Sequence, residues 1–270
     1  MTSAFHDFEH EQWQGAVDAY HAGWGGLTTQ TVPAVLDALG VAAGTRLLDV
    51  ATGPGYLAAA AAACGAGVVG LDFSAAMVAR ARALHPAVAF REGDAERLPF
   101  VGAEFDAVAM NFGILHLARP EAAVAEAARV LRPGGRYGFT AWADPGRAAG
   151  FALVLDAVRR CGRPVELPIG PDFFRFSEPA TCAAALEAAG FAGAAVRRLD
   201  LAWRLDSPDD LFRAFHLGTA RTGALLRGQD AEARSRIAAA VREAAERFRR
   251  PDGGVEVPMP ALLATGTCAG

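Results

Sequence analysis

The first half of the chain alternates between short apolar runs and longer stretches with helical spacing. Apolar runs of strand length occupy 47–50, 67–72, 88–90, 105–112 and the second half of 131–140, and alanine-rich or amphipathic stretches separate most of them. Strands that alternate with helices in this way form a parallel sheet with helices on both of its faces. The pattern therefore predicts an α/β domain built on a doubly wound sheet.

Helical spacing dominates the start of the chain and a long segment near its end. Trp13, Val17, Tyr20 and Trp24 recur at three- and four-residue steps, which predicts an amphipathic helix over 9–24. Apolar positions recur in the same way toward both ends of 208–250. We expect these segments to lie outside the sheet.

These patterns divide the chain into three regions. A helical cover is expected over 1–40 and a helical insert over 207–250. The α/β domain is expected over 41–206 and 251–270, with the insert between its last two strands. Residues 194–205 and 255–267 have the apolar positions expected of those two strands.

A tight glycine turn follows the first apolar run. Gly53 and Gly55 stand between the run at 47–50 and an alanine-rich helix, and the second apolar run ends in Asp72. This is the layout of a nucleotide-type site at the carboxyl edge of a parallel sheet, where glycine lets the backbone approach a ligand. Asp72 is placed to accept hydrogen bonds from ribose hydroxyls. The alternative is an ordinary helix-entry turn, so support must come from further segments.

That support occurs at the expected spacings. Asp94 follows the short run at 88–90, and Asn111 stands near the end of the next run. Residues 131–140 then combine a helix stop, Pro133-Gly134-Gly135, with a fifth strand. Polar residues that follow successive parallel strands meet at one edge of the sheet.

These four segments, in order across 45–142, resemble the class I S-adenosylmethionine (SAM)-dependent methyltransferases. The resemblance is greatest to the branch that includes the ubiquinone and menaquinone biosynthesis enzymes. It implies a Rossmann-like sheet of seven strands, mostly parallel, with the last two strands as an antiparallel hairpin. One position departs from the family, because Ala51 replaces the first glycine of the turn.

The resemblance also implies roles for individual residues. Asp49 would orient the turn and the aminoacyl ammonium of SAM, Asp72 would hold the ribose, and Asp94 would accept from the adenine amino group. Tyr20 is a candidate for the methionine end, as is Trp24, although the helix 9–24 can equally well pack only on the sheet edge. The full set of cofactor-binding candidates comprises Tyr20, Asp49, Ala51, Thr52, Gly53, Gly55, Asp72, Phe73, Met77, Gly93, Asp94, Ala95, Asn111 and Phe112.

Histidine is the candidate general base, because it can take a proton near neutral pH. His116 leads because it follows the fourth strand at the expected active-site edge, with His216 second and His21 third. A loop-bracing role for His116 and a mechanism without any base remain open. The candidate substrate pocket consists of Trp24, Phe174, Phe212, Phe215 and His216. Its composition favours a small, largely apolar or aromatic substrate.

Composition removes several other classes of function. The sequence contains no lysine, so it lacks the phosphate-binding lysine of a P-loop, a Schiff-base lysine and the tyrosine–lysine pair of short-chain dehydrogenases. A net charge of −4 without a basic run argues against nucleic acid. Four scattered cysteines argue against a zinc or disulfide framework, and we expect no bound metal.

Localisation and partners follow from the same survey. No apolar stretch reaches the roughly 20 residues that span a bilayer, and the polar start of the chain is unlike a signal peptide. We therefore expect a cytoplasmic enzyme with a small-molecule substrate, no membrane partner and, as an open alternative to a monomer, a homodimer.

The reaction that these features favour is O-, N- or C-methylation of a small molecule by in-line transfer, with S-adenosylhomocysteine as the product of SAM. A decarboxylase or cyclase of the same fold that binds SAM is one alternative. A noncatalytic SAM-binding or partner-binding protein is another. A nicotinamide dehydrogenase conflicts with the absence of lysine and with Asp94.

Overall fold

The computed structural model describes residues 4–144 and 146–269. Its contacts divide the chain into two compact units, one comprising 1–27, 144–170 and 200–260 and the other 28–143, 171–199 and 261–270. Residues 1–3 and 270, which belong to the expected cover and to the end of the expected α/β domain, lie outside the described residues. The domain boundaries expected from the sequence stay a prediction.

The second unit contains the predicted seven-stranded sheet, with strand order β3-β2-β1-β4-β5-β9-β6. Strands β3, β2, β1, β4 and β5 run parallel, whereas β9 is antiparallel to both of its neighbours, β5 and β6. The fold class expected from the sequence is therefore confirmed. The strands are β1 (Arg46–Val50), β2 (Gly67–Asp72), β3 (Ala89–Glu92), β4 (Phe105–Met110), β5 (Leu131–Trp142), β6 (Phe191–Leu199) and β9 (Ala261–Cys268).

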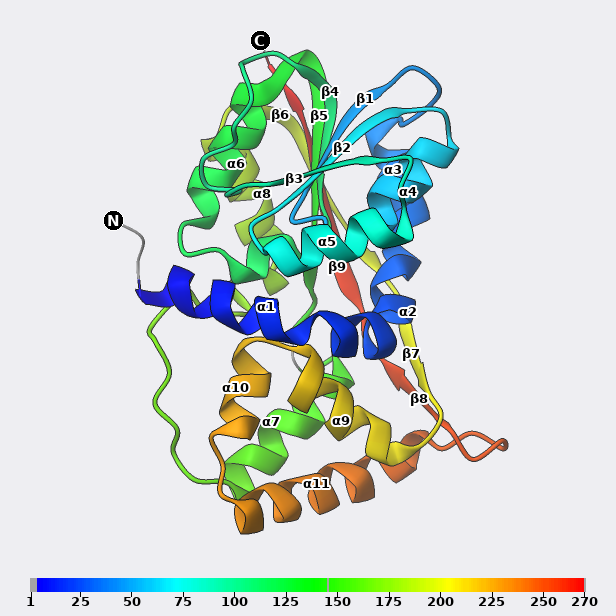
Figure 1. Cartoon of the computed structure of the whole chain (residues 1–270), viewed down its shortest axis with the longest axis vertical. Coiled ribbons are helices and arrows are strands. Elements are labelled where there is room, and N and C mark those ends of the chain that lie inside the picture. Colours follow the sequence, from blue (N-terminus) through cyan, green and yellow to red (C-terminus); the bar gives the residue numbers. More distant parts are fainter. Residues whose placement is uncertain (1–3, 145, 270) are drawn as a thin grey trace. The chain divides into compact units, whose positions relative to one another are not determined.

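Helices cover both faces of this sheet, and Figure 1 shows α6 and α8 on one side and α3 and α4 on the other. Ser74 begins α5 as expected, because its hydroxyl accepts a hydrogen bond of 3.2 Å from the Met77 N–H. The helical segments are η1 (Thr29–Thr31), α3 (Val32–Leu39), α4 (Tyr56–Ala63), α5 (Ala75–Leu84), η2 (Gly113–His116), α6 (Pro120–Val130), η3 (Arg175–Ser177) and α8 (Pro179–Ala188).

The core of this unit lies between the sheet and those helices. Strand β1 is buried from its second residue onward, since the central strand of a doubly wound sheet is covered on both faces. Leu47 packs with α3 and α4, and Leu263 of β9 joins the same cluster. Burial of β1 fixes its register between β2 and β4, and so fixes the residues that emerge at its carboxyl end.

Two expected strands are interrupted. The segment 194–205 divides into β6 and β7 (Ala202–Leu205), and 255–267 divides into β8 (Val255–Pro258) and β9. Pro258 and Pro260 lack the N–H that a continuous ladder needs, and the intervening Met259 N–H instead donates to the Leu201 carbonyl at 2.9 Å. Strands β7 and β8 form a separate antiparallel pair in the first unit.

The first unit is mainly helical. Figure 1 shows α7, α9, α10 and α11 gathered together. The apolar stripe expected near the end of the insert is buried at Ile237, Val241 and Ala245, whereas Phe248 is only half-buried. The elements are α1 (Ala4–Gly23), α2 (Gly25–Thr28, whose last residue belongs to the other unit), α7 (Ala149–Cys161), α9 (Pro208–Gly218), α10 (Arg221–Arg227), α11 (Ala231–Ala245) and η4 (Glu246–Phe248).

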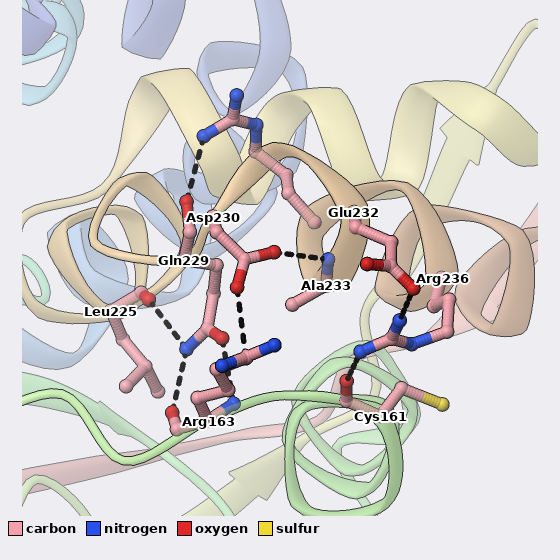
Figure 2. A network of polar contacts seen from close by, with 9 residues as sticks. Cys161, Arg163, Leu225, Gln229, Asp230, Glu232, Ala233 and Arg236 are labelled. Carbon is pink, nitrogen blue, oxygen red and sulfur yellow. Dashed lines mark hydrogen bonds and ion pairs between the residues drawn. The ribbon is translucent and has the colours of Figure 1, made fainter.

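A polar network joins the end of α7 to the start of α11, as Figure 2 shows. The Gln229 amide accepts from the Arg163 N–H at 2.7 Å and donates to the Arg163 carbonyl at 2.9 Å. Asp230 caps α11 through the Ala233 N–H at 2.7 Å and also pairs with the Arg163 guanidinium. These contacts satisfy backbone groups near the end of α7 and at the start of α11 that would otherwise lack partners.

A buried ion pair fixes α1 within the same unit. The fully buried Glu9 carboxylate accepts from the Arg221 guanidinium at 2.8 Å and from the Trp13 indole at 3.2 Å. The Arg221 guanidinium also lies over the Phe5 ring, 4.3 Å from its centroid. No helix among the described residues is both long enough and apolar enough to cross a bilayer.

Candidate functional site

The predicted cofactor residues of the sheet unit stand at the carboxyl ends of its parallel strands. Asp49 is the penultimate residue of β1, Asp72 is the last residue of β2, and Asn111 directly follows β4. Asp94 follows β3 after Gly93. The structure brings Asp49, Asp72 and the intervening turn into one hydrogen-bonded group.

The turn 51–55 has a left-handed backbone at three of its five residues. Ala51, Gly53 and Gly55 have φ angles of 54°, 53° and 83°. A Cβ atom at Gly55 would lie 2.7 Å from the Phe90 Cζ atom, so glycine is required there for space as well as for conformation. At Gly53 such an atom would meet no heavy atom of the described residues within 4 Å. The turn therefore exposes its backbone to open space at Gly53.

Ala51 occupies the position where the family has glycine, and the structure shows how alanine is tolerated. A left-handed backbone costs a non-glycine residue about 1–2 kcal/mol. The Ala51 side chain faces Gly113 at the start of η2, where any added Cβ would overlap the Ala51 Cβ. The alanine is accommodated because position 113 has no side chain.

We predict that residues 51 and 113 are energetically coupled. Gly113→Ala should lower the free energy of unfolding by about 2 kcal/mol through overpacking. Adding Ala51→Gly should recover part of that loss, since it removes one of the two overlapping methyl groups. A double-mutant cycle by urea denaturation measures the coupling. Additive effects of the two substitutions would contradict this account.

Asp49 is the more deeply buried of the two acidic side chains that contact the turn, with 1% of its surface exposed. Its Oδ2 atom accepts from the Thr52 hydroxyl at 2.6 Å and from the Ala58 N–H at 3.1 Å. Its Oδ1 atom is also buried and has no hydrogen-bond partner among the described residues. Burial raises the pKa of Asp49 to about 7, the charge of Asp72 adds to the increase, and the two hydrogen bonds oppose it.

The raised pKa of Asp49 predicts a pH-dependent stability. The folded chain retains this proton up to about pH 7, whereas the unfolded chain releases it near pH 4. The contribution of Asp49 to stability is therefore complete below about pH 4 and is lost as the pH rises to about 7, at up to about 1.4 kcal/mol per pH unit. Asp49→Asn should remove this component.

Chemical denaturation of the wild type and of Asp49→Asn from pH 4 to 8 tests the prediction. The stability difference between the two proteins should shift in favour of Asp49→Asn as the pH rises. Asp37→Asn, at an exposed position on α3, serves as the matched control and should follow the wild-type curve. Parallel profiles for the wild type and Asp49→Asn would rule out the assignment.

Asp72 ties the turn to the end of β2. Its Oδ2 atom accepts from the Gly53 N–H at 2.8 Å and its Oδ1 atom accepts from the Ser74 N–H at 2.9 Å. The side chain is buried, so these two backbone donors fix its orientation. Phe73, the next residue, is half-buried, whereas Met77 is a buried residue of α5.

The segment after β3 folds back as a tight turn. The Gly93 N–H donates to the Asp72 carbonyl at 2.9 Å, and the Arg97 N–H donates to the Asp94 carbonyl at 3.1 Å. The Asp94 carboxylate accepts from the Glu96 N–H at 2.8 Å. Ala95 is buried within this turn.

Asn111 belongs to a polar network that sequence reasoning missed. Its Oδ1 atom accepts from the hydroxyls of Thr31 at 2.8 Å and Thr140 at 2.7 Å, and its amide donates to the Thr28 carbonyl at 3.1 Å. Thr140 also accepts from the N–H of Phe112 at 2.9 Å. The available signal was a hydroxyl residue inside the apolar run 137–142, where a buried polar group needs a partner.

Phe112 has a left-handed backbone, with φ of 60°. Its ring stacks on Trp142 of β5 with centroids 4.1 Å apart. The Thr140 hydroxyl and this aromatic contact hold a conformation that a bulky residue rarely adopts.

The candidate bases lie in different units. His116 ends η2 in the sheet unit, is half-buried, and has an edge contact with Phe173, with ring centroids 5.9 Å apart. Phe174 packs on the same Phe173 ring at 5.1 Å. His216 lies on α9 and His21 on α1, both in the helical unit.

His216 stacks on Phe212, with ring centroids 5.4 Å apart. Partial burial lowers the pKa of His216, and the charges of Arg227 and Arg234 lower it further. The neutral imidazole is therefore favoured, which is the form that a general base requires.

The remaining aromatic candidates make internal contacts of the helical unit. Trp24 and Phe215 are both buried, and their rings meet edge to face at 4.9 Å. The Trp24 indole donates to the Ala214 carbonyl at 3.0 Å. Tyr20 meets Trp13 edge to face at 5.5 Å. These contacts give each residue a packing role, and the roles expected of them in cofactor or substrate binding stay predictions.

Comparison with known proteins identifies the family of the chain. A model of the methyltransferase domain family matches residues 48–139. A demethylmenaquinone methyltransferase of Beutenbergia cavernae is 45% identical over 112 residues, which is 42% of this chain and 47% of that protein. A demethylmenaquinone methyltransferase of Mycolicibacterium paratuberculosis is 36% identical over 180 residues, which is 62% of this chain and 76% of that protein.

A solved structure is also similar. Phosphoethanolamine N-methyltransferase 2 of Haemonchus contortus, in complex with phosphomonomethylethanolamine and S-adenosylhomocysteine, superposes with a TM-score of 0.58 at 18% identity, over 99% of this chain and 60% of that one. That likeness supports the fold alone. The chain spans about half the length of several curated relatives that it matches.

The strand order of the sheet is that of a class I SAM-dependent methyltransferase fold. Asp49, Asp72 and the turn 51–55 lie at the sheet edge where such a fold binds its cofactor. Given the extent of the match to the mycobacterial relative, the chain belongs to the class I SAM-dependent methyltransferases of the ubiquinone and menaquinone type.

Proposed function

We propose that the chain transfers the methyl group of SAM to a small, largely apolar or aromatic molecule. The observation that carries the proposal is the group formed by Asp49, Asp72 and the turn 51–55 at the carboxyl edge of the sheet. The name of the curated relatives, demethylmenaquinone methyltransferase, supports a quinone-type acceptor. A quinone-type acceptor would be methylated on a ring carbon or on an oxygen, and N-methylation is the alternative if the acceptor is an amine.

The residues present suit this cofactor. The buried Oδ1 atom of Asp49 has no partner among the described residues, and a ligand ammonium would supply the donor that it lacks. The Ala51 to Gly55 backbone would underlie the methionine part, and Asp72 would accept from both ribose hydroxyls. Asp94 and the Ala95 N–H would recognise the adenine edge, with Phe73 on its face. Tyr20, Thr52, Met77, Gly93, Asn111 and Phe112 complete the proposed cofactor shell.

SAM supplies an activated methyl group on a sulfonium, so the chain's main task is to position the two reactants. His116, which follows β4 in the sheet unit, is the proposed base and would take the proton of a hydroxyl or amine acceptor. His216 is the second choice. Trp24, Phe174, Phe212 and Phe215 are the other side chains proposed to contact the acceptor, and the helical segments 1–40 and 207–250 are proposed to contribute to acceptor binding. Cytoplasmic localisation and a homodimer are part of the same proposal.

We predict that cofactor binding depends on Asp72. Asp72→Asn should weaken binding of S-adenosylhomocysteine at least tenfold in isothermal titration calorimetry, because charge-assisted hydrogen bonds to ribose are lost. Asp106→Asn, at the opposite end of the sheet on β4, is the matched control and should bind like the wild type. NAD should not bind. If Asp72→Asn and Asp106→Asn bound S-adenosylhomocysteine with equal affinity, the assignment of Asp72 to the ribose would be wrong.

The activity itself is tested by incubating the protein with methyl-labelled SAM and reduced demethylmenaquinone. A methylated quinone product in mass spectrometry, formed more slowly by Asp72→Asn when SAM is below saturation, is the expected result. Tight SAM binding with no methyl transfer to any of a panel of phenols, quinols and amines would argue for another reaction of the same fold.

The His116 prediction separates a general base from a loop brace. If His116 removes a proton, His116→Gln should lower kcat by about 10²–10⁴-fold while the affinity for S-adenosylhomocysteine stays unchanged. The loss should shrink at high pH, where a hydroxyl acceptor ionises without help. Wild-type and His116→Gln pH–rate profiles of the same height and shape would exclude the base and leave positioning as the whole mechanism.

A further inference from the structure

Glu96 is a buried carboxylate that the proposed mechanism does not use. Only 7% of the residue is exposed. Glutamate is rarely buried to this extent unless its carboxylate has partners. Both partners come from one residue, because Oε1 accepts from the Arg119 backbone N–H at 2.8 Å and Oε2 accepts from the Arg119 Nε–H at 2.8 Å. Arg119 is the N-cap of α6, where the helix dipole also favours a negative charge.

The position of Glu96 in the chain gives this pair its significance. Glu96 lies in the turn closed by the Arg97 N–H to Asp94 carbonyl bond, and its own N–H donates to the Asp94 carboxylate at 2.8 Å. Its backbone therefore braces Asp94 from within the turn. Its side chain anchors the same turn to α6. Asp94 and Ala95 are the residues proposed to recognise adenine.

A second anchor follows along the same helix. The Leu98 N–H donates to Glu126 at 2.7 Å, and the Arg129 guanidinium donates to the carbonyls of Leu98 at 3.0 Å and Phe100 at 2.9 Å. The segment 94–100, which follows β3, is thus bonded to α6 from the first turn of the helix to its last turn. Because α6 begins four residues after His116, one helix supports both the adenine side and the proposed base.

We propose that Glu96 is a positioning residue for adenine recognition, acting by holding Arg119 and so fixing the backbone and carboxylate of Asp94. The inference rests on the proposed cofactor site. A loosened turn would still contact the ribose through Asp72, but it would no longer present the Asp94 acceptor and the Ala95 donor at fixed positions. A loosened turn should therefore reduce the preference of the site for adenine over a base whose hydrogen-bonding edge is reversed.

Glu96→Gln tests this directly. The glutamine amide nitrogen would face the Arg119 Nε–H, so that two donors would oppose each other. Calorimetry would compare S-adenosylhomocysteine with S-inosylhomocysteine, in which an oxo group replaces the 6-amino group. We expect about tenfold weaker binding of the adenosyl ligand and less than about twofold change for the inosyl ligand, so that their affinity ratio falls.

Arg119→Ala is a second variant, for which we expect a smaller fall in the affinity ratio. It removes the guanidinium contact but keeps the backbone N–H bond to Glu96, so the ratio should fall by only about threefold. The double variant should behave like Arg119→Ala, because the glutamine amide nitrogen then faces no opposing donor and its oxygen keeps the bond to the backbone N–H of residue 119. Arg46→Ala, which removes the exposed Arg46–Glu104 pair of the same unit, is the control and should leave the ratio unchanged.

The outcomes separate two kinds of failure. A wild-type ratio in folded Glu96→Gln or Arg119→Ala, with thermal melting to establish folding, would overturn the role of Glu96 and leave the cofactor site intact. A wild-type protein that binds neither ligand would overturn the proposed function, and the inference would fail with it. A uniform loss for both ligands would indicate a purely structural contact and would also overturn the inference.

Discussion

The geometry of the site depends on two buried carboxylates that hold one glycine turn from different strands. Asp49 at the end of β1 accepts from Thr52 and from the first turn of α4, while Asp72 at the end of β2 accepts from Gly53. Hydrogen bonds from protein donors compensate each buried side chain for the water contacts that it loses on folding. The burial of Asp49, with a smaller contribution from the charge of Asp72, raises the pKa of Asp49 to about 7. The turn is therefore shaped by charge as well as by glycine.

The sheet was predictable because its determinants are local. The apolar runs, the glycine turn and the Pro133-Gly134-Gly135 segment each specify a strand or its end within a few residues. The interruptions at Leu201 and Met259 were not predicted, since the apolar spacing continues across both positions. Only pairing shows the break, when the Met259 N–H finds the Leu201 carbonyl, residues far apart in the chain. That pairing assigns β7 and β8 to the helical unit and β6 and β9 to the sheet.

The same distinction applies to the site. Asp49, Asp72 and Asp94 could be placed at one sheet edge from the sequence because each lies at or just after the carboxyl end of a strand, and parallel strands bring these ends together. The partners that orient them were not found. Asn111 depends on Thr31 and Thr140, and Glu96 depends on Arg119, through contacts that span from 23 to 80 residues. A lone threonine or glutamate has no periodicity to mark it, so such supporting contacts become visible only in the fold.

The distribution of candidates suggests how one fold serves many acceptors. The residues proposed to hold SAM are fixed by backbone donors and strand ends, with Tyr20 as the exception in the helical unit. The candidates for the acceptor, in contrast, are Trp24 between α1 and α2, Phe174 before α8 and three residues of α9, and they contribute side chains rather than backbone. Side chains on helices and loops can change without disturbing the sheet. Ala51 shows the converse constraint, because even one methyl group in the turn requires an empty position at Gly113. The proposed cofactor contacts are thus tied to the core of the sheet unit, whereas half-buried acceptor candidates such as Phe174 and Phe212 can vary with less effect on the fold.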